Sequence, residues 1–234
     1  MPLDITLLTC SFNDNMLTAF MIKRLFECLG YIIPTCVMDN GTTEKCDDTF
    51  MRVFNGVDNF RYKIIPQYKY PSQNHCASID YALWNCINTK YVLLCDNDIK
   101  AYRNISELLA LRHQYDAIGE IGYDTVPPNR LFPYLCIFNL ERMKRENIHY
   151  FDINRCIVSG NTTNERVYSK YGNVYDTGCS FLLDIQSHNW NIKEIKISNY
   201  ALHYKGVSYD GMIGADGIQN KREFIYRDLL STVE

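Results

Sequence analysis

The sequence predicts a single α/β domain with a mostly parallel central sheet and helices on both faces. Short apolar segments alternate with longer amphipathic ones through the first half of the chain, an order that requires crossovers between parallel strands. A buried core is possible, since 47% of the 234 residues are hydrophobic and 22% are charged. No apolar run reaches the roughly 18 residues of a membrane-spanning helix, so we expect no stable membrane insertion. The net charge of −3 argues against nucleic acid as a partner, because that partner needs a basic face.

The first half of the chain fits a strand–helix repeat. Its first helix is predicted to be capped by Asp14 and to end at Gly30, with Leu17, Met21 and Leu25 on one apolar face. The predicted strands cover residues 5–9, 33–38, 62–65 and 91–95. The predicted helices cover residues 14–29, 46–54 and 72–88.

The second half is more mixed. Helices are predicted over residues 104–113, 176–187 and 218–230, and strands over 117–122, 134–138 and 192–197. No repeat, low-complexity tract or linker divides the chain, so we expect residues 1–234 to form one domain.

The ten cysteines do not fit a disulfide scaffold or a zinc site. No C-x-x-C pair occurs, and several cysteines lie in or beside apolar runs, where a free thiol behaves as a small hydrophobe. Residues 1–10 lack the basic start and the cleavage site of a signal peptide. We therefore expect reduced thiols and a cytoplasmic protein.

Three polar clusters follow predicted strands, at residues 9–13, 39–41 and 96–98. The carboxyl ends of parallel strands share one edge of a sheet, where ligands bind, so we expect these clusters to converge. In the last cluster Asp96 and Asp98 are two residues apart and point to the same face of an extended chain. Two adjacent carboxylates favour Mg²⁺ or Mn²⁺, although Asp-Asn-Asp is also a common turn composition.

The Asp96-Asn97-Asp98 strand end and the preceding Asn74-x-x-x-Ser78-x-Asp80-Tyr-Ala-Leu helix resemble the nucleotide-sugar domain of GT-A-type glycosyltransferases. The resemblance is closest to glycosyltransferase family 2 and its small virus-encoded members. It covers residues 5–98 and returns near 176–208. It implies a GT-A-like (Rossmann-like) fold, with a nucleotide-sugar-binding half at 1–100 and an acceptor-binding half with a C-terminal lid at 101–234.

The implied activity is metal-dependent transfer of a sugar from a nucleotide-diphosphate donor to a hydroxyl of a glycan or glycoconjugate acceptor, with inversion. The resemblance matches Thr9, Ser11 and Asn13 to the loop that holds the nucleotide. Asp39 matches the acidic residue that contacts the base, often uracil, which favours a UDP-sugar. Asp80 lies where the ribose is expected, but Ser78-Ile79-Asp80 replaces the Ala-Arg-Asn of the family pattern.

The same resemblance matches Asp96, Asn97 and Asp98 to the motif that binds the metal and the diphosphate. In that motif Asp98 is the usual direct ligand and Asp96 more often faces the ribose. His75 stands where a basic residue lies near the diphosphate.

A later segment, Tyr200-Ala-Leu-His203-Tyr-Lys205-Gly206-Val-Ser208, carries a candidate third ligand. A neutral imidazole suits Mn²⁺, although a lone histidine in a loop is commonly a surface residue. Lys205 and Ser208 offer a charge and a hydroxyl to a leaving diphosphate, and the glycines at 211, 214 and 217 are typical of a mobile lid. In the resembling family a His-x-x-Gly-x-Ser segment orders over the bound donor.

An inverting transfer needs a base that takes the proton of the acceptor hydroxyl. Asp176, before a predicted helix, is the first candidate, and it fits a helix N-cap equally well. Asp124 and Glu120 are weaker candidates. Trp190, Tyr134 and Phe132 offer rings for stacking on an acceptor sugar, although aromatic residues more often pack in a core.

Two other functions stay open from the sequence. Asp96-x-Asp98 also resembles the opening of haloacid-dehalogenase-like phosphatases, in which the first aspartate, here Asp96, is the nucleophile. That motif usually follows the first strand of its domain, and here it follows the fourth predicted strand. A non-catalytic nucleotide-sugar-binding module is the second alternative, and it has no use for His203 or a leaving-group site.

Overall fold

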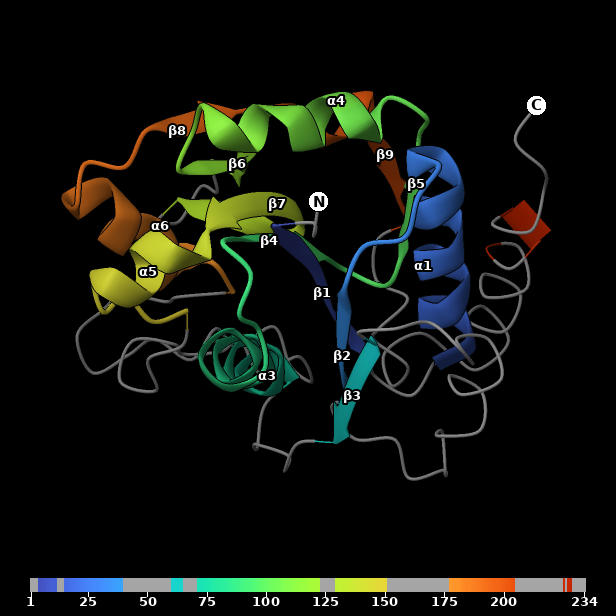
Figure 1. Ribbon diagram of the computed structural model, residues 1–234, viewed down its shortest axis with the longest axis horizontal. Helices are drawn as coiled ribbons and strands as arrows, with labels where there is room; N and C mark the ends of the chain where they lie inside the picture. The colour runs from blue at the N-terminus through green and yellow to red at the C-terminus, as the bar shows by residue number, and fades with distance from the viewer. Residues whose placement is uncertain are drawn as a thin grey trace, which may run out of the picture.

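The computed structural model describes residues 4–11, 15–39, 60–64, 71–122, 129–150 and 177–204, with residues 225, 227 and 228. Its main sheet has seven strands in the order β3-β2-β1-β4-β7-β6-β8 (Figure 1). Strand β7 is antiparallel to β4 and β6, and the other pairings in this sheet are parallel. The predicted class, an α/β fold with a mostly parallel sheet, is confirmed.

The main sheet is formed by β1 (Ile5–Ser11), β2 (Thr35–Asp39), β3 (Phe60–Ile64), β4 (Tyr91–Cys95), β6 (Ala117–Gly122), β7 (Arg130–Asn139) and β8 (Ile192–Glu194). A second sheet pairs β5 (Ile99–Ala101) with β9 (Ala201–His203). The helices are α1 (Asn15–Leu29), α3 (Pro71–Asn85), α4 (Ile105–Ala110), α5 (Leu140–Arg145) and α6 (Cys179–Ser187). Two 3₁₀ turns, η1 (Leu111–His113) and η2 (Ile197–Asn199), complete the described elements.

Successive residues of the central strands point to opposite faces and build two cores. On β1, Leu7 packs with α1 and α4, whereas Leu8 packs with α3, α5 and α6. Both leucines are fully buried. Figure 1 shows α1 and α4 on one side of the sheet and α3, α5 and α6 on the other. Helices therefore cover both faces of the sheet, as expected.

Several helices and strands begin or end at residues other than those predicted. Strand β7 begins at Arg130 rather than at residue 134, and α6 begins at Cys179 rather than at residue 176. The strand predicted over 192–197 ends at Glu194, because the Ile197 amide donates to the Glu120 carboxylate at 2.7 Å and the chain enters η2. Elements α5, β5 and β9 were not predicted. The predicted helix at 46–54 lies outside the described residues, and within 218–230 residues 225, 227 and 228 are described and helical.

The described part of the chain contains no helix with the length and hydropathy needed to cross a membrane. The eight cysteines in this part of the chain are free thiols.

An ion-pair network joins α5 to the residues that precede β6 and β8. The Arg142 guanidinium donates to Glu146 at 2.7 Å, to Asp116 at 2.5 Å and to the His188 carbonyl at 3.0 Å. The Trp190 indole donates to the second Glu146 oxygen at 2.6 Å. Partial burial raises the pKa of Glu146, but the hydrogen bonds from Arg142 and Trp190 outweigh it and hold that pKa below its usual value.

Replacing Arg142 by alanine is expected to lower the free energy of unfolding by about 2 kcal/mol at pH 7, since Asp116 and Glu146 lose their partner. Urea unfolding measures the loss. The lowered pKa of Glu146 gives a contribution that is present above its unfolded value of about 4.3 and lost as pH falls. The difference in the free energy of unfolding between the wild type and Arg142→Ala should therefore be smaller at pH 3 than at pH 7.

The matched control is Lys23→Ala, which removes an exposed ion pair to Glu27 with a 3.9 Å separation. That pair is expected to contribute less than about 0.5 kcal/mol. Equal losses in the two variants would contradict a structural role for the Arg142 network.

Candidate metal and donor site

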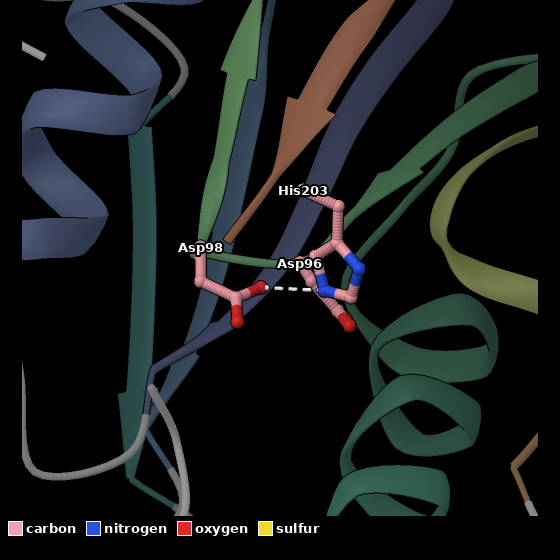
Figure 2. Close-up of side chains that lie close together, drawn as sticks. All are labelled: Asp96, Asp98 and His203. Carbon is pink, nitrogen blue, oxygen red and sulfur yellow. Dashed lines mark ion pairs between the residues drawn. The ribbon is translucent and has the colours of Figure 1, made fainter. Parts of the chain in front are cut away.

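Strand β4 leads directly into Asp96-Asn97-Asp98, and the chain continues as β5. Strand β9 pairs antiparallel with β5, with Ile99 opposite His203, and this pairing brings His203 to Asp98. The His203 Nε2 atom lies 3.1 Å from Asp98 Oδ1, a pair that Figure 2 shows with Asp96 beside it. One ligand atom from each of Asp96, Asp98 and His203 lies within 4.8 Å of the others. The structure thus brings the three predicted metal ligands together.

The cluster is charged and largely shielded from water. Only 4% of the Asp98 side chain and 21% of the Asp96 side chain are exposed. His75 Nε2 lies 3.4 Å from Asp96 Oδ1. Burial raises the pKa of Asp96, and Asp98 adds to the rise, while the His75 and His203 imidazoles oppose it. Two carboxylates and an imidazole in this arrangement suit Mn²⁺ or Mg²⁺, because a cation relieves the repulsion between the acids.

Beneath the cluster, a chain of side-chain hydrogen bonds joins three elements. The Asn97 amide donates to Thr18 Oγ1 at 3.1 Å, and Thr18 donates to Ser11 Oγ at 3.1 Å. All three residues are buried. These two hydrogen bonds fix the end of β1, the helix α1 and the turn after β4 relative to one another. Thr18 was not predicted from the sequence, where the available signal was a polar residue on the buried face of an apolar helix.

The other residues predicted at the strand ends are also buried. Asp39 ends β2 directly opposite Ser11 in the sheet register and is fully buried. The Thr9 side chain is likewise fully buried, and its hydroxyl has no hydrogen-bond partner among the described residues. The structure therefore brings Ser11 and Asp39 to the same edge of the sheet as Asp96, as the convergence argument predicted.

Helix α3 carries His75 and Asp80, and the two have different surroundings. His75 faces Asp96, as described above. The Asp80 carboxylate accepts the Tyr150 amide at 2.7 Å and lies 3.1 Å from His149 Nδ1. Asp80 thus ties α3 to the end of the segment that follows α5. These contacts do not support a place at the ribose.

Five of the predicted site residues, namely Asn13, Asp124, Asp176, Lys205 and Ser208, lie outside the described residues, as does the predicted lid at 211–217. The weaker candidate Glu120 accepts the Ile197 amide. Next to Asp176, Thr177 is buried, and its hydroxyl lies 3.5 Å from Cys76 Sγ, one residue from His75. Gly178 follows with a φ of +87°.

Asp228 contacts β5 and the residue that follows β9. Asp228 accepts from Lys100 Nζ at 2.6 Å and from the Tyr204 hydroxyl. Burial raises the pKa of Asp228, but these two hydrogen bonds outweigh it and hold that pKa below its usual value. Since Lys100 lies on β5 and Tyr204 directly follows β9, Asp228 clamps together the two strands that hold Asp98 and His203 in contact.

Searches with the sequence matched no protein-family model and no curated protein. Solved structures with a similar fold exist. The galactosyltransferase LgtC, in complex with donor and acceptor sugar analogues, has a TM-score of 0.57 at 11% identity over 98% of this chain and 97% of its own. TarS residues 1–349 from S. aureus, in complex with UDP-GlcNAc, has a TM-score of 0.56 at 10% identity over 100% of this chain and 68% of its own.

A third similar structure is the mannosyltransferase PcManGT from Pyrobaculum calidifontis, in complex with GDP-Man and Mn²⁺. Its TM-score is 0.54 at 10% identity, over 83% of this chain and 55% of its own. Of these three proteins, LgtC is a galactosyltransferase and PcManGT is a mannosyltransferase, and the TarS and PcManGT structures contain the nucleotide sugars UDP-GlcNAc and GDP-Man. The chain has the α/β fold of the GT-A-type glycosyltransferases, with an Asp-Asp-His cluster at the carboxyl end of its central parallel strand.

Proposed function

We propose that the protein is a metal-dependent glycosyltransferase that moves a sugar from a nucleotide-diphosphate donor to a hydroxyl of a glycan or glycoconjugate. The observation that carries this proposal is the cluster of Asp96, Asp98 and His203 in a GT-A-type fold. Mn²⁺ or Mg²⁺ held by Asp98 and His203, with Asp96 beside them, would supply positive charge to the departing diphosphate.

The chain's own residues have separate proposed roles in donor binding. His75 lies beside Asp96 and is available to a diphosphate oxygen when protonated, with Lys205 and Ser208 adding a charge and a hydroxyl. Thr9, Ser11, Asn13 and Asn97 shape the nucleotide pocket. Buried Asp39 is proposed to contact the base, which favours UDP. The UDP-GlcNAc and GDP-Man complexes of TarS and PcManGT agree with a nucleotide-sugar donor and leave the base open.

The transfer itself needs a base for the acceptor proton. We assign this role to Asp176, with Asp124 as the second candidate. The assignment is supported by the contact of Thr177 with Cys76, because Cys76 adjoins His75 in α3. A base on the acceptor side of the sugar, opposite the leaving diphosphate, gives inversion at the anomeric carbon.

The first test is a thermal-shift panel of UDP, GDP, CMP and ADP, each with and without Mn²⁺. A ligand that binds only the folded state raises the melting temperature. At a concentration of 100 Kd it adds about 2.7 kcal/mol to the free energy of unfolding. We expect UDP with Mn²⁺ to give the largest shift, and the shift to disappear in Asp98→Ala.

The outcomes of the panel separate the alternatives. A shift without release of UDP from any UDP-sugar would indicate a binding module. No shift with any nucleotide, together with phosphatase activity lost in Asp96→Asn, would replace the transferase by the phosphatase.

A further inference from the structure

Alternate side chains of β7 stack in a column that ends on His203. The Arg130 guanidinium lies 4.7 Å from the centre of the Phe132 ring. Phe132 stacks on Tyr134 with ring centres 4.5 Å apart and planes 21° apart. Tyr134 stacks on His203 at 4.1 Å and 19°. Alternate residues of a strand face the same way, so Arg130, Phe132 and Tyr134 lie on one face of β7.

The column is built into the sheet at Gly122 and at the end of β4. A Cβ atom at Gly122 would lie 2.3 Å from Phe132 Cζ, so only glycine leaves room for that ring. The Tyr134 carbonyl also accepts the Asp96 amide at 3.1 Å. Tyr134 therefore contacts two members of the cluster, Asp96 through its backbone and His203 through its ring.

The second ring nitrogen of His203 shows why this stacking matters. A metal-binding histidine usually donates from that nitrogen to a carbonyl or carboxylate, which fixes the orientation of the ring. His203 Nδ1 is buried and has no hydrogen-bond partner among the described residues. Within the described part of the chain, the ring is therefore held by Asp98 at its edge and by Tyr134 on its face.

The same stacking argues against a role for these aromatic residues in binding an acceptor sugar. The rings of Phe132 and His203 both stack on Tyr134, so protein groups occupy its faces. Trp190 is buried, with its indole N–H bonded to Glu146. The sugar-stacking alternative from the sequence is therefore not supported for Tyr134 or Trp190.

We propose that Tyr134 is a positioning residue of the metal site. Its ring holds the His203 imidazole in the plane that directs Nε2 into the Asp96–Asp98 cluster, in the place of the usual hydrogen bond to Nδ1. This role rests on the proposed metal site and adds to it a residue outside the ligand set. What recognises His203 is the aromatic ring, and the tyrosine hydroxyl is not required.

The test compares Tyr134→Leu with Tyr134→Phe in the full chain. In the metal-free protein, ring stacking shields the His203 carbon-bound protons, and His203→Ala identifies their NMR signal among the five histidines. We expect the shielded signal in the wild type and in Tyr134→Phe, and its loss in Tyr134→Leu. Titration with Mn²⁺ alone, followed by EPR of the free ion, should show about tenfold weaker binding in Tyr134→Leu only.

A double-mutant cycle separates positioning from general structural damage. In a His203→Ala background, Tyr134→Leu should weaken Mn²⁺ binding no further, because the ring it positions is absent. Phe132→Leu is the matched control, since it shortens the column without removing the ring that contacts His203, and it should keep most of the Mn²⁺ affinity. Melting temperatures of all variants identify any that fold poorly.

Two results would overturn the proposal. One is a Tyr134→Leu protein that keeps both the shielded His203 signal and the wild-type Mn²⁺ affinity. The other is an equal loss of affinity from Tyr134→Leu with and without His203. If His203→Ala itself binds Mn²⁺ as the wild type does, the metal site of the proposed function is wrong, and the role of Tyr134 fails with it.

Discussion

Replacing Asp98 by asparagine is expected to lower the rate of sugar transfer by about 10³-fold, the scale of losing a central electrostatic contact in an active site. Asp98 is the most buried acid of the cluster and directly faces His203. Asparagine keeps the shape but removes the charge that binds a cation. The rate is measured as UDP release, with the donor that the thermal-shift panel identifies.

The stability of this variant should change little. Without a cation, the substitution relieves repulsion between Asp98 and Asp96, so we expect the metal-free melting temperature to move by less than about 4 °C. The control is Glu107→Gln, which removes the charge of an exposed residue on α4 and should keep full activity. A transfer rate in Asp98→Asn close to that of the wild type would show that the reaction does not depend on this carboxylate.

The largest loss of stability is expected from Gly178→Ala. Gly178 has a φ of +87°, and a Cβ atom there would lie 2.1 Å from the Leu131 carbonyl oxygen on β7. Strand and helix would have to separate, which adds to the left-handed strain of about 1–2 kcal/mol. We expect a total loss of about 3–5 kcal/mol in urea unfolding. Activity should fall as well, because Gly178 adjoins Thr177 and the proposed base Asp176.

Gly30→Ala provides a close control. Gly30 has a φ of +75°, and a Cβ atom there would meet nothing within 4 Å. Both variants carry the left-handed strain, and only Gly178→Ala adds the clash. Gly30→Ala should therefore lose only this strain, about 1–2 kcal/mol, and keep its activity. Similar losses in the two variants would mean that the contact between Gly178 and Leu131 adds nothing to the cost.

The central sheet could be predicted because the local sequence of its main strands is enough to identify them. Strand β4 is a continuous apolar run and β1 is mostly apolar. Asp96 and Asp98 follow β4 directly, so the topology predicted their place at the edge of the sheet. The fold class and the convergence of the acidic pair with Ser11 and Asp39 followed from the same pattern. Short helix α5 was missed, although Asn139 caps it through a hydrogen bond from the Arg142 amide.

The features that complete the site have no local signal. Strands β5 and β9 contain three residues each, too few for a periodic pattern, and each is defined by its distant partner. For the same reason the sequence pointed to His203 through its chemistry and its resemblance, without locating its contact with Asp98. Asp80 shows a second limit of prediction from sequence. The rotation of a helix about its axis decides whether a carboxylate faces a site or a neighbouring loop, and the sequence does not give that rotation precisely.

The clamp between Asp228 and the β5–β9 pair has a consequence for the order in which the site forms during synthesis. Lys100 and Asp228 are 128 positions apart, so their contact closes a very long loop. A ribosome releases β5 long before it releases β9 or Asp228, and Asp98 spends that time without His203. The cluster can therefore be completed only after His203 has left the ribosome, and a chain that terminates before His203 would carry the acidic pair without its histidine.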